Sequence, residues 1–529
     1  MKRYLLALLV IFSFGATAQS TTGLDLLGTR SWVRVSWQPV AGATQYRVYL
    51  STGEQKPQSP SRVLTPEVTR AYFTGVQPET TYHIRVEALA AGKLRKAWTG
   101  TVKTRKDAVR DPYEQQEVER QPGSAAVPQG MQVVWQDEFN DESLNLNKWV
   151  PEYFSTLNYL NETNRKEMLE GRLPEPGLKF NGNTLTIFVN DSVPKRIYMP
   201  GGNQKISSIQ TYNWRTGENL LDNSRGGYFE VKVKRSRRGQ PKGVNTAFWF
   251  DSPGPDLRYY LQEGTELNGT RGIRPAGQVF EIDVFEYITA QFVLHGHVNG
   301  KGEFQRNLNT HIAEGFQHED TWVTHGILWS PTAVKHFING QLIKEYTDKH
   351  QIYSPNHFMN MFLGSYGSGG EVSMEVDYIR YYQWPLRDGN ELPNPGFEDS
   401  GSLAPWEGDG TLSAGKTGSY GVSLLPGQGI EQYIYLDNDT PYSLEYWSKG
   451  AGELEVTVEN VEMVSGKLTA IASRKEKGKK NFGRASLDFR SGKEYGDHKK
   501  TVRVSVTNRG TSEMNVDDFS IKKVKKPVK

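Results

Sequence analysis

The sequence predicts an all-β protein built from three sandwich-like units. Short runs of alternating apolar and polar residues recur along almost the whole chain, and no long segment has the periodicity of a helix. Gly, Pro and Thr separate these runs, as expected of turns between strands. The 529 residues exceed what one hydrophobic core usually serves. We therefore expect a central β-sandwich jelly roll flanked by two smaller β-sandwich domains.

Residues 1–19 have the pattern of a signal peptide. Lys2 and Arg3 precede an apolar run from Tyr4 to Phe14, and small residues follow in "GATA". The run is shorter than the roughly 20 residues that a spanning helix needs. We expect a secreted or periplasmic protein. The chain has no cysteine, which excludes disulfides, thiol catalysis, zinc–thiolate sites and a lipid-modified cysteine.

The charge of the chain is nearly balanced. Lys and Arg number 63 against 60 Asp and Glu, a formal net charge of +3. Such a balance does not favour binding to nucleic acid or to a membrane surface. We expect a monomer without a cofactor, and the sequence leaves open whether a structural calcium binds the central sandwich.

Residues 22–105 form the first predicted sandwich. The runs "WVRVSW", "QYRVYLS" and "VQPETTYHIRVEAL" resemble the fibronectin type III pattern, including its tryptophan, here Trp37, and the tyrosine before the penultimate strand. Residues 106–130 are charged, contain Pro and Gln and lack apolar periodicity, which predicts a linker.

Residues 131–386 form the second predicted sandwich, and residues 390–525 the third. The second contains runs such as "MQVVWQDEF", "YFEVKVK", "TAFWF" and "VFEIDVFEYI". The third opens with "NPGFEDSGSLAPWEG" and ends with "VDDFSI", which resemble the first and last strands of jelly-roll carbohydrate-binding modules. Four aromatic residues of the third unit are candidate sugar-stacking surfaces or core residues: Trp406, Tyr433, Tyr435 and Trp447.

The run "VFEIDVFEYI" at residues 279–288 holds three carboxylates within six residues. Glu281 and Asp283 share one face of a strand because side chains alternate. In a regular strand Glu286 would point to the opposite face. One extra residue near Val284 and Phe285, a β-bulge, would return Glu286 to the face of the other acids.

Paired carboxylates on one strand face suit the cleavage of glycosidic bonds. One carboxyl group protonates the leaving oxygen, while the other attacks the sugar or activates water. With the bulge, Glu281 and Glu286 converge toward the roughly 5 to 5.5 Å separation that retaining enzymes use. A negative Asp283 would disfavour ionisation of Glu286 and so help it to keep its proton.

The hexapeptide "EIDVFE" resembles the E-x-D-x-x-E signature of glycoside hydrolase family 16, the bulged type found in laminarinases, agarases, porphyranases and κ-carrageenases. Six segments resemble those of the family in the same order over residues 131–385. The resemblance implies a secreted, endo-acting, retaining hydrolase of a β-linked polysaccharide. It implies that Glu281 is the nucleophile, Asp283 the supporting acid and Glu286 the general acid/base. The alternative is the solvated face of an amphipathic strand in a non-catalytic protein.

Four further residues are candidates for substrate binding. The resemblance places Trp249, in "AFWF", on a concave face where it would stack on a sugar, although a core role is the alternative. Trp214 is either a platform for a sugar or a local packing residue. His295 either binds a sugar hydroxyl or is a structural histidine. Arg274 belongs to a group of arginines that suit sulfate.

The substrate prediction rests on departures from the laminarinase pattern. The family run "WPxxGEID" is "RPAGQVFEID" here, without the tryptophan, and an insertion at residues 251–278 precedes the acids. Eight arginines are expected in loops near the cleft: Arg215, Arg225, Arg235, Arg237, Arg238, Arg258, Arg271 and Arg274. They favour a red-algal galactan of agar, porphyran or carrageenan type. The alternative is a β-1,3- or mixed-linkage glucan.

Overall fold

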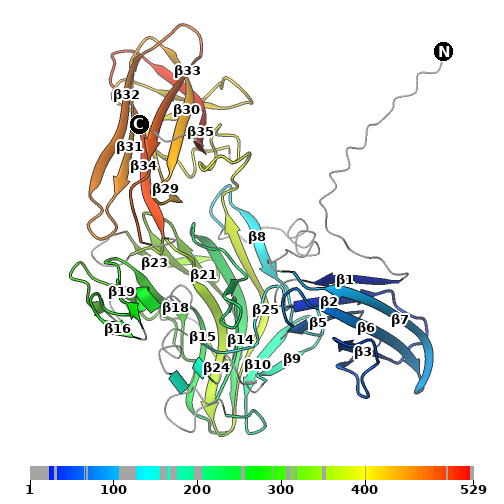
Figure 1. The fold of residues 1–529 in the computed structure, drawn as a ribbon. Coiled ribbons are helices and arrows are strands. Elements are labelled where there is room, and N and C mark those ends of the chain that lie inside the picture. Colours follow the sequence, from blue (N-terminus) through cyan, green and yellow to red (C-terminus); the bar gives the residue numbers. More distant parts are fainter. Residues whose placement is uncertain are drawn as a thin grey trace, which may run out of the picture. The chain divides into compact units, whose positions relative to one another are not determined.

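The computed structural model is all-β, as the sequence predicts (Figure 1). It describes residues 23–524 with gaps. The gaps are 29–31, 65, 67–68, 75, 106–126, 155–161, 164, 167–174, 196–204, 252–256, 268, 289, 306–310, 314, 316–317, 348–352, 400 and 496–497. The predicted signal peptide and most of the predicted linker lie outside the described residues. Among the helices of the described part, none has the length and apolar character needed to cross a membrane.

The chain divides into two compact units, and the first comprises Met1–Asp111 with Asn145–Asn147. One sheet has the order β1 (Leu24–Gly28), β2 (Trp32–Trp37), β5 (Arg70–Thr74). The other has the order β4 (Arg62–Leu64), β3 (Gln45–Ser51), β6 (Thr81–Ala90), β7 (Lys93–Lys103). Trp37 and Tyr46 pack edge to face in the core between them, with ring centroids 5.3 Å apart. The backbone N–H of Gln77 donates to the hydroxyl of Tyr82 at 2.7 Å, which fixes the turn before β6.

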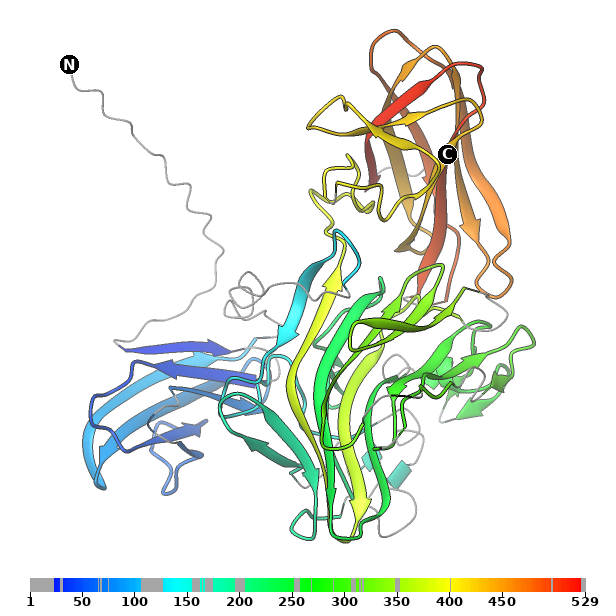
Figure 2. The same cartoon turned by 180° about the vertical axis from the view of Figure 1, so that it is seen from behind.

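The second unit, Pro112–Leu144 with Lys148–Lys529, begins with two large antiparallel sheets. Along one sheet the order is β23 (Gln341–Tyr346), β22 (Val334–Ile338), β21 (Trp322–Trp329), β14 (Gly227–Arg238), β25 (Glu371–Gln383), β10 (Leu185–Val189), β9 (Gly177–Phe180), and β8 (Gln132–Asp137) also pairs with β25. Along the other it is β11 (Lys205–Gln210), β24 (Asn360–Ser368), β15 (Lys242–Asp251), β18 (Val279–Phe285), β19 (Leu294–Val298), β20 (Phe304–Gln305). The long green and yellow strands of these sheets are also visible from behind (Figure 2).

Aromatic side chains fill the space between these two sheets. Phe229 of β14 packs against Phe250 of β15, with ring centroids 4.9 Å apart. Phe229 also stacks on Tyr381 at 4.0 Å and on Trp329 at 4.9 Å. Burial of such large rings is the main source of stability in a sandwich core. Because Phe250 and Phe248 face this core, the alternate residues of β15 face the other way.

Short elements connect the long strands of this sandwich. A small hairpin pairs β12 (Tyr212–Asn213) with β13 (Glu218–Asn219). The insertion before the acidic strand contains α4 (Leu257–Tyr260) and a second hairpin of β16 (Glu266–Leu267) and β17 (Thr270–Arg271).

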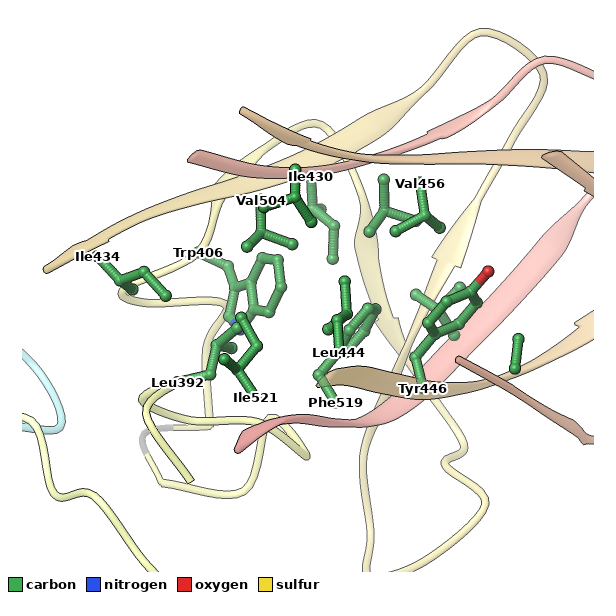
Figure 3. Packing of buried hydrophobic residues seen from close by; sticks show 14 of the residues in the cluster. Leu392, Trp406, Ile430, Ile434, Leu444, Tyr446, Val456, Val504, Phe519 and Ile521 are labelled. Carbon is green, nitrogen blue, oxygen red and sulfur yellow. The ribbon is translucent and has the colours of Figure 1, made fainter. Parts of the chain in front are cut away.

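The C-terminal part of the second unit is a further sandwich of two five-stranded sheets. One has the order β26 (Glu407–Gly408), β29 (Gly429–Asp437), β34 (Lys499–Asn508), β31 (Glu453–Val461), β32 (Leu468–Lys477). The other has the order β27 (Thr411–Ser413), β28 (Gly421–Leu424), β35 (Met514–Lys523), β30 (Pro441–Gly450), β33 (Gly483–Arg490). Figure 3 shows Trp406 and Phe519 in the core between them. Trp406 is therefore a packing residue, and Tyr435 is buried as well.

Hydrogen bonds join this sandwich to the preceding one within the second unit. Asn356 and Lys499 exchange two: the Lys499 backbone N–H donates to the Asn356 carbonyl at 2.6 Å, and Asn356 Nδ2 donates to the Lys499 carbonyl at 2.8 Å. The Arg225 guanidinium donates to the Tyr435 carbonyl at 3.0 Å and to the Glu391 carboxylate at 2.5 Å.

Candidate active site

The predicted bulge is confirmed in strand β18. Across the β15–β18 pair, Trp249 is opposite Asp283 and Phe248 is opposite Phe285. Val284 therefore has no partner and is the extra residue. The bulge changes the phase of the strand, so that Phe285 faces the core with Phe248 and the following Glu286 returns to the face of Glu281 and Asp283.

Neighbouring strands add residues to the face that carries the three carboxylates. Trp249 and Asp251 of β15 lie opposite Asp283 and Glu281. Phe362 of β24 lies opposite Trp249, and their rings stack at 4.6 Å with an interplanar angle of 8°. Tyr153 packs against both of these rings, at 6.2 and 6.1 Å. The carboxylates thus border an aromatic cluster, which lowers the local polarity.

Burial raises the pKa of Asp283 well above its ordinary value. Its side chain is 2% exposed, and Glu281, Glu286 and Asp251 add to the shift because their negative charges disfavour another. Asp283 therefore holds a proton more firmly than an ordinary aspartate. Burial opposes the negative charge considered for Asp283 from the sequence, because it removes the water that would solvate that charge.

Burial also raises the pKa of Glu286, and a hydrogen bond from Asn245 lowers it in part. Asn245 Nδ2 donates to Glu286 Oε1 at 3.0 Å. The shift helps Glu286 to carry a proton, as a general acid requires. Its main cause is burial and not the neighbouring aspartate that the sequence suggested.

The pKa of Tyr366, in strand β24, is affected by the same three carboxylates. Burial raises its pKa well above the ordinary value, then Tyr153 adds to the shift, then Glu286, Asp283 and Glu281. A phenol that stays neutral is a hydrogen-bond donor beside carboxylates. Neither Tyr366 nor Asn245 was predicted from sequence. The only available signal was their position on the alternating faces of β15, which pairs with β18, and of β24, which pairs with β15.

Of the four predicted substrate-binding residues, the structure brings only Trp249 next to the carboxylates. Trp214 is 4% exposed and packs edge to face on Phe154 and Tyr212, at 5.3 and 5.5 Å. Its environment is that of the packing alternative. His295 lies opposite Ile282, on the core face of β18, and is fully buried.

His295 and Arg274 both contact backbone carbonyl groups. His295 Nε2 lies 2.9 Å from the Tyr353 carbonyl oxygen. Arg274 donates through Nε to the Tyr260 carbonyl at 3.0 Å, which ties the insertion together. These contacts favour structural roles for both residues, so a role of either in binding sugar stays a prediction.

Most of the arginines expected near a sulfate have protein partners instead. Arg215 pairs with Glu152, Arg237 with Glu319 and Arg238 with Asp320. Arg225 pairs with Glu391, and Arg235 is buried. In the part of the chain that the structure describes, no group of three His, Cys, Asp or Glu residues is arranged to hold a metal ion.

Comparisons with known proteins identify two domains of the chain. Residues 222–383 match Glycosyl hydrolases family 16, and residues 24–104 match the Fibronectin type III domain. Glucan endo-1,3-beta-glucosidase A1 of Niallia circulans is 24% identical over 294 residues, which are 48% of this chain and 38% of that protein. The chain thus spans well under half the length of this relative.

Solved structures that match this chain include the laminarinase of Flavobacterium sp. UMI-01, with 18% identity, 48% of this chain and 100% of that chain covered, and a TM-score of 0.32. Another is the GlcNAcα1-4Gal releasing endo-β-galactosidase of Clostridium perfringens, with 15% identity, coverage of 57% and 81%, and a TM-score of 0.36. The match that includes all three carboxylates is that of residues 222–383. The chain therefore contains a domain of glycosyl hydrolases family 16, preceded by a fibronectin type III domain.

Proposed function

We propose that the protein is an endo-acting, retaining glycoside hydrolase that cleaves a β-linked polysaccharide outside the cytoplasm. The observation that carries the proposal is the bulge at Val284, which puts Glu281, Asp283 and Glu286 on one face within the family 16 match. A plain amphipathic strand has no need of such a bulge. The burial of Asp283 and its raised pKa also distinguish this face from a solvated one.

The proposed reaction has two steps. In the first, a Glu281 oxygen attacks the anomeric carbon and forms a glycosyl ester, while Glu286 gives its proton to the leaving glycosidic oxygen. In the second, the Glu286 carboxylate takes a proton from water, which attacks the same carbon and releases Glu281. Two inversions leave the β-configuration unchanged.

Asp283 supports this exchange without forming a bond to sugar. Its raised pKa favours a proton on Asp283, which lowers the total negative charge of the group so that Glu281 can carry the charge that a nucleophile needs. It also sits between the two reacting residues in the strand, where a change in its protonation alters the field at both.

Among substrates, a β-1,3- or mixed-linkage glucan is now favoured over a red-algal galactan. The relative from Niallia circulans is named as a glucan endo-1,3-beta-glucosidase. The galactan prediction depended on arginines free to bind sulfate, and Arg215, Arg237 and Arg238 are instead paired with carboxylates. A galactan remains the second candidate because the tryptophan of the "WPxxGEID" run is absent from "RPAGQVFEID".

A substrate panel with an anomer assay tests the proposal. The protein is incubated with laminarin, lichenan, agarose, porphyran and carrageenan, and oligosaccharides are followed by chromatography. We expect oligosaccharides from laminarin or lichenan, with the β-anomer appearing first in proton NMR. Products from agarose, porphyran or carrageenan alone would establish the galactan alternative. An initial α-anomer would contradict the retaining mechanism, and no product from any polymer would contradict the hydrolase assignment.

A further inference from the structure

Asn245 contacts Glu286 from β15, the strand next to the one that carries the acids. It lies in β15, two positions before Ala247 and four before Trp249, and therefore on the carboxylate face of that strand. Across the next pair it is opposite Tyr366 of β24. The register thus brings the Asn245 amide close to Glu286, at the end of the carboxylate face where the bulge lies.

The two hydrogen bonds of Asn245 fix the orientation of its amide. The backbone N–H of Tyr287 donates to Asn245 Oδ1 at 2.6 Å. A backbone N–H can only donate, so the atom that faces it must be the oxygen. The amide nitrogen Nδ2 then faces Glu286 and donates to Oε1 at 3.0 Å.

A second side chain holds the same peptide segment from the opposite sheet. Arg235 of β14 donates through Nη1 to the Tyr287 carbonyl at 2.9 Å. It is 1% exposed and lies over the Phe285 ring, 4.6 Å from the centroid. Burial lowers the pKa of Arg235 to about 9, so it stays mainly protonated at neutral pH. Tyr287 has a φ of 58°, which a tyrosine rarely adopts without such contacts.

We propose that Asn245 is the positioning residue of the general acid/base: its amide engages Glu286 Oε1, leaving Oε2 as the oxygen that carries and transfers the proton. This inference rests on the proposed function of Glu286. Asn245 does not itself touch the reacting atoms. It acts by holding one carboxyl oxygen as an acceptor and by fixing the backbone of the next residue.

The proposed arrangement has a consequence for acidity. A hydrogen bond donated to a carboxylate favours the charged form, whereas burial favours the neutral form. Asn245 therefore prevents burial from making Glu286 too weak an acid to give up its proton. Loss of the donor must move the alkaline limb of the pH–rate profile to higher pH.

Asn245→Asp separates this role from simple support of the backbone. An aspartate at 245 keeps an oxygen for the Tyr287 N–H but presents a second oxygen, with negative charge, to Glu286. The matched control is Asn299→Asp. Asn299 also donates Nδ2 to a glutamate, Glu303 at 3.0 Å, and accepts backbone N–H groups, but in the exposed hairpin after β19.

The assay measures kcat/KM against pH on the polysaccharide and on a 2,4-dinitrophenyl glycoside, whose leaving group needs no proton. For N245D we expect roughly a tenfold or greater loss on the polysaccharide, the value of one hydrogen bond to a charged group. The loss on the activated glycoside should be much smaller, and the alkaline limb should lie at higher pH. N299D should match the unmodified protein in every measurement.

Equal losses on both substrates, or an unchanged pH profile, would overturn the role of Asn245 and leave the hydrolase assignment standing. If N245D does not fold, Asn245→Ser removes the same amide donor and must shift the alkaline limb in the same direction. An unmodified protein that hydrolyses neither substrate would instead overturn the proposed function, together with the inference that depends on it.

Discussion

Two buried aspartates, Asp283 in β18 and Asp517 in β35, occupy closely similar positions in different sandwiches. Each lies opposite a tryptophan of an antiparallel neighbour, Trp249 or Trp447, at a place where the register shifts. Asp283 is 2% exposed and Asp517 is fully buried. By burial, strand type and local sequence they are nearly equivalent.

Their surroundings differ in the number of backbone donors, although the Asp518 carboxylate also adds to the rise in the pKa of Asp517. Asp517 Oδ2 accepts the backbone N–H groups of Lys416 and Thr417 at 2.7 and 3.2 Å, and Oδ1 accepts that of Asp518 at 2.7 Å. Burial raises the pKa of Asp517, and these donors oppose the rise. Around Asp283 the neighbours are carboxylates, which add to the effect of burial. Burial alone therefore does not mark a functional acid; the charge of its surroundings does.

The largest effect is expected at the two glutamates that flank Asp283. Glu281→Gln and, separately, Glu286→Gln should lower kcat by about a thousandfold or more, because each removes a charge or a proton that the chemistry needs at nearly constant volume. Circular dichroism should show the folded state unchanged. Glu266→Gln, in an exposed strand of the insertion, is the control. A rate close to that of the unmodified protein in either variant would remove the two-carboxylate assignment.

Asp283→Asn should cause a smaller loss, roughly tenfold, with a shifted pH optimum, since the residue tunes its neighbours without forming a bond. The same variant should be more stable at neutral pH. The folded-state pKa lies well above 3.8, so the folded protein keeps a proton that the unfolded chain releases, and stability falls as pH rises above 3.8.

The asparagine side chain of Asp283→Asn does not titrate, so the variant should not lose stability in this way as the pH rises above 3.8. Thermal unfolding between pH 3 and pH 8 measures the difference, which should vanish at the acid end. Asp191→Asn, at an exposed turn, is the control. A variant that is less stable than the unmodified protein at pH 7 would show that Asp283 is held by donors after all.

Asp517→Asn should destabilise the protein, whereas Asp283→Asn should stabilise it at neutral pH. The amide nitrogen of an asparagine cannot accept the N–H groups that now bond to a carboxylate oxygen, so at least one buried donor loses its partner. We expect a loss of about 2 kcal/mol in the free energy of unfolding, measured in urea, and unchanged activity. Asp488→Asn, on an exposed part of β33, should change neither. If Asp283→Asn and Asp517→Asn change the free energy of unfolding in the same direction at neutral pH, the distinction between the two aspartates is contradicted.

Deletion of residues 390–529 tests what the whole sandwich around Asp517 contributes. If it binds sugar, as its resemblance to carbohydrate-binding modules predicts, its loss should lower activity severalfold on insoluble polysaccharide and hardly change turnover of soluble oligosaccharides. Rates must be compared below the unfolding temperature, because the bonds of Asn356 and Arg225 to this part are lost. Equal losses on both substrates would indicate support of folding, and equal retention would indicate a spacer.

The difference between these aspartates also shows how far sequence alone reaches. Alternation along "VFEIDVFEYI" was enough to predict the strand, the shared face of Glu281 and Asp283 and the bulge that returns Glu286. Alternation did not show that burial raises the pKa of Asp283. Protonation depends on how completely the other strands exclude water, and the local pattern does not contain that information.

The same limit applies to the aromatic and basic residues. The sequence around a tryptophan does not show whether the side chain borders a site, as that of Trp249 in β15 does, or fills a core, as that of Trp406 before β26 does. His295 is one residue from Gly296, which lies opposite Glu281, yet its own side chain points to the core. Arg237 and Arg238 were among the arginines expected in loops near the cleft, but they belong to β14 and pair with acidic residues about 80 positions away along the chain.

The sequence by itself determined the all-β class, the pattern of strands and the three acids, because these follow from alternation and from the spacing of residues within one strand. Only the tertiary structure decided which residues approach those acids. The partners Asn245, Tyr366 and Asp251 come from other strands, selected by sheet order and register. The raised pKa of Asp283 and the orientation of Glu286 depend on burial and on contacts distant in sequence, and a strand acquires both only when the sheet assembles.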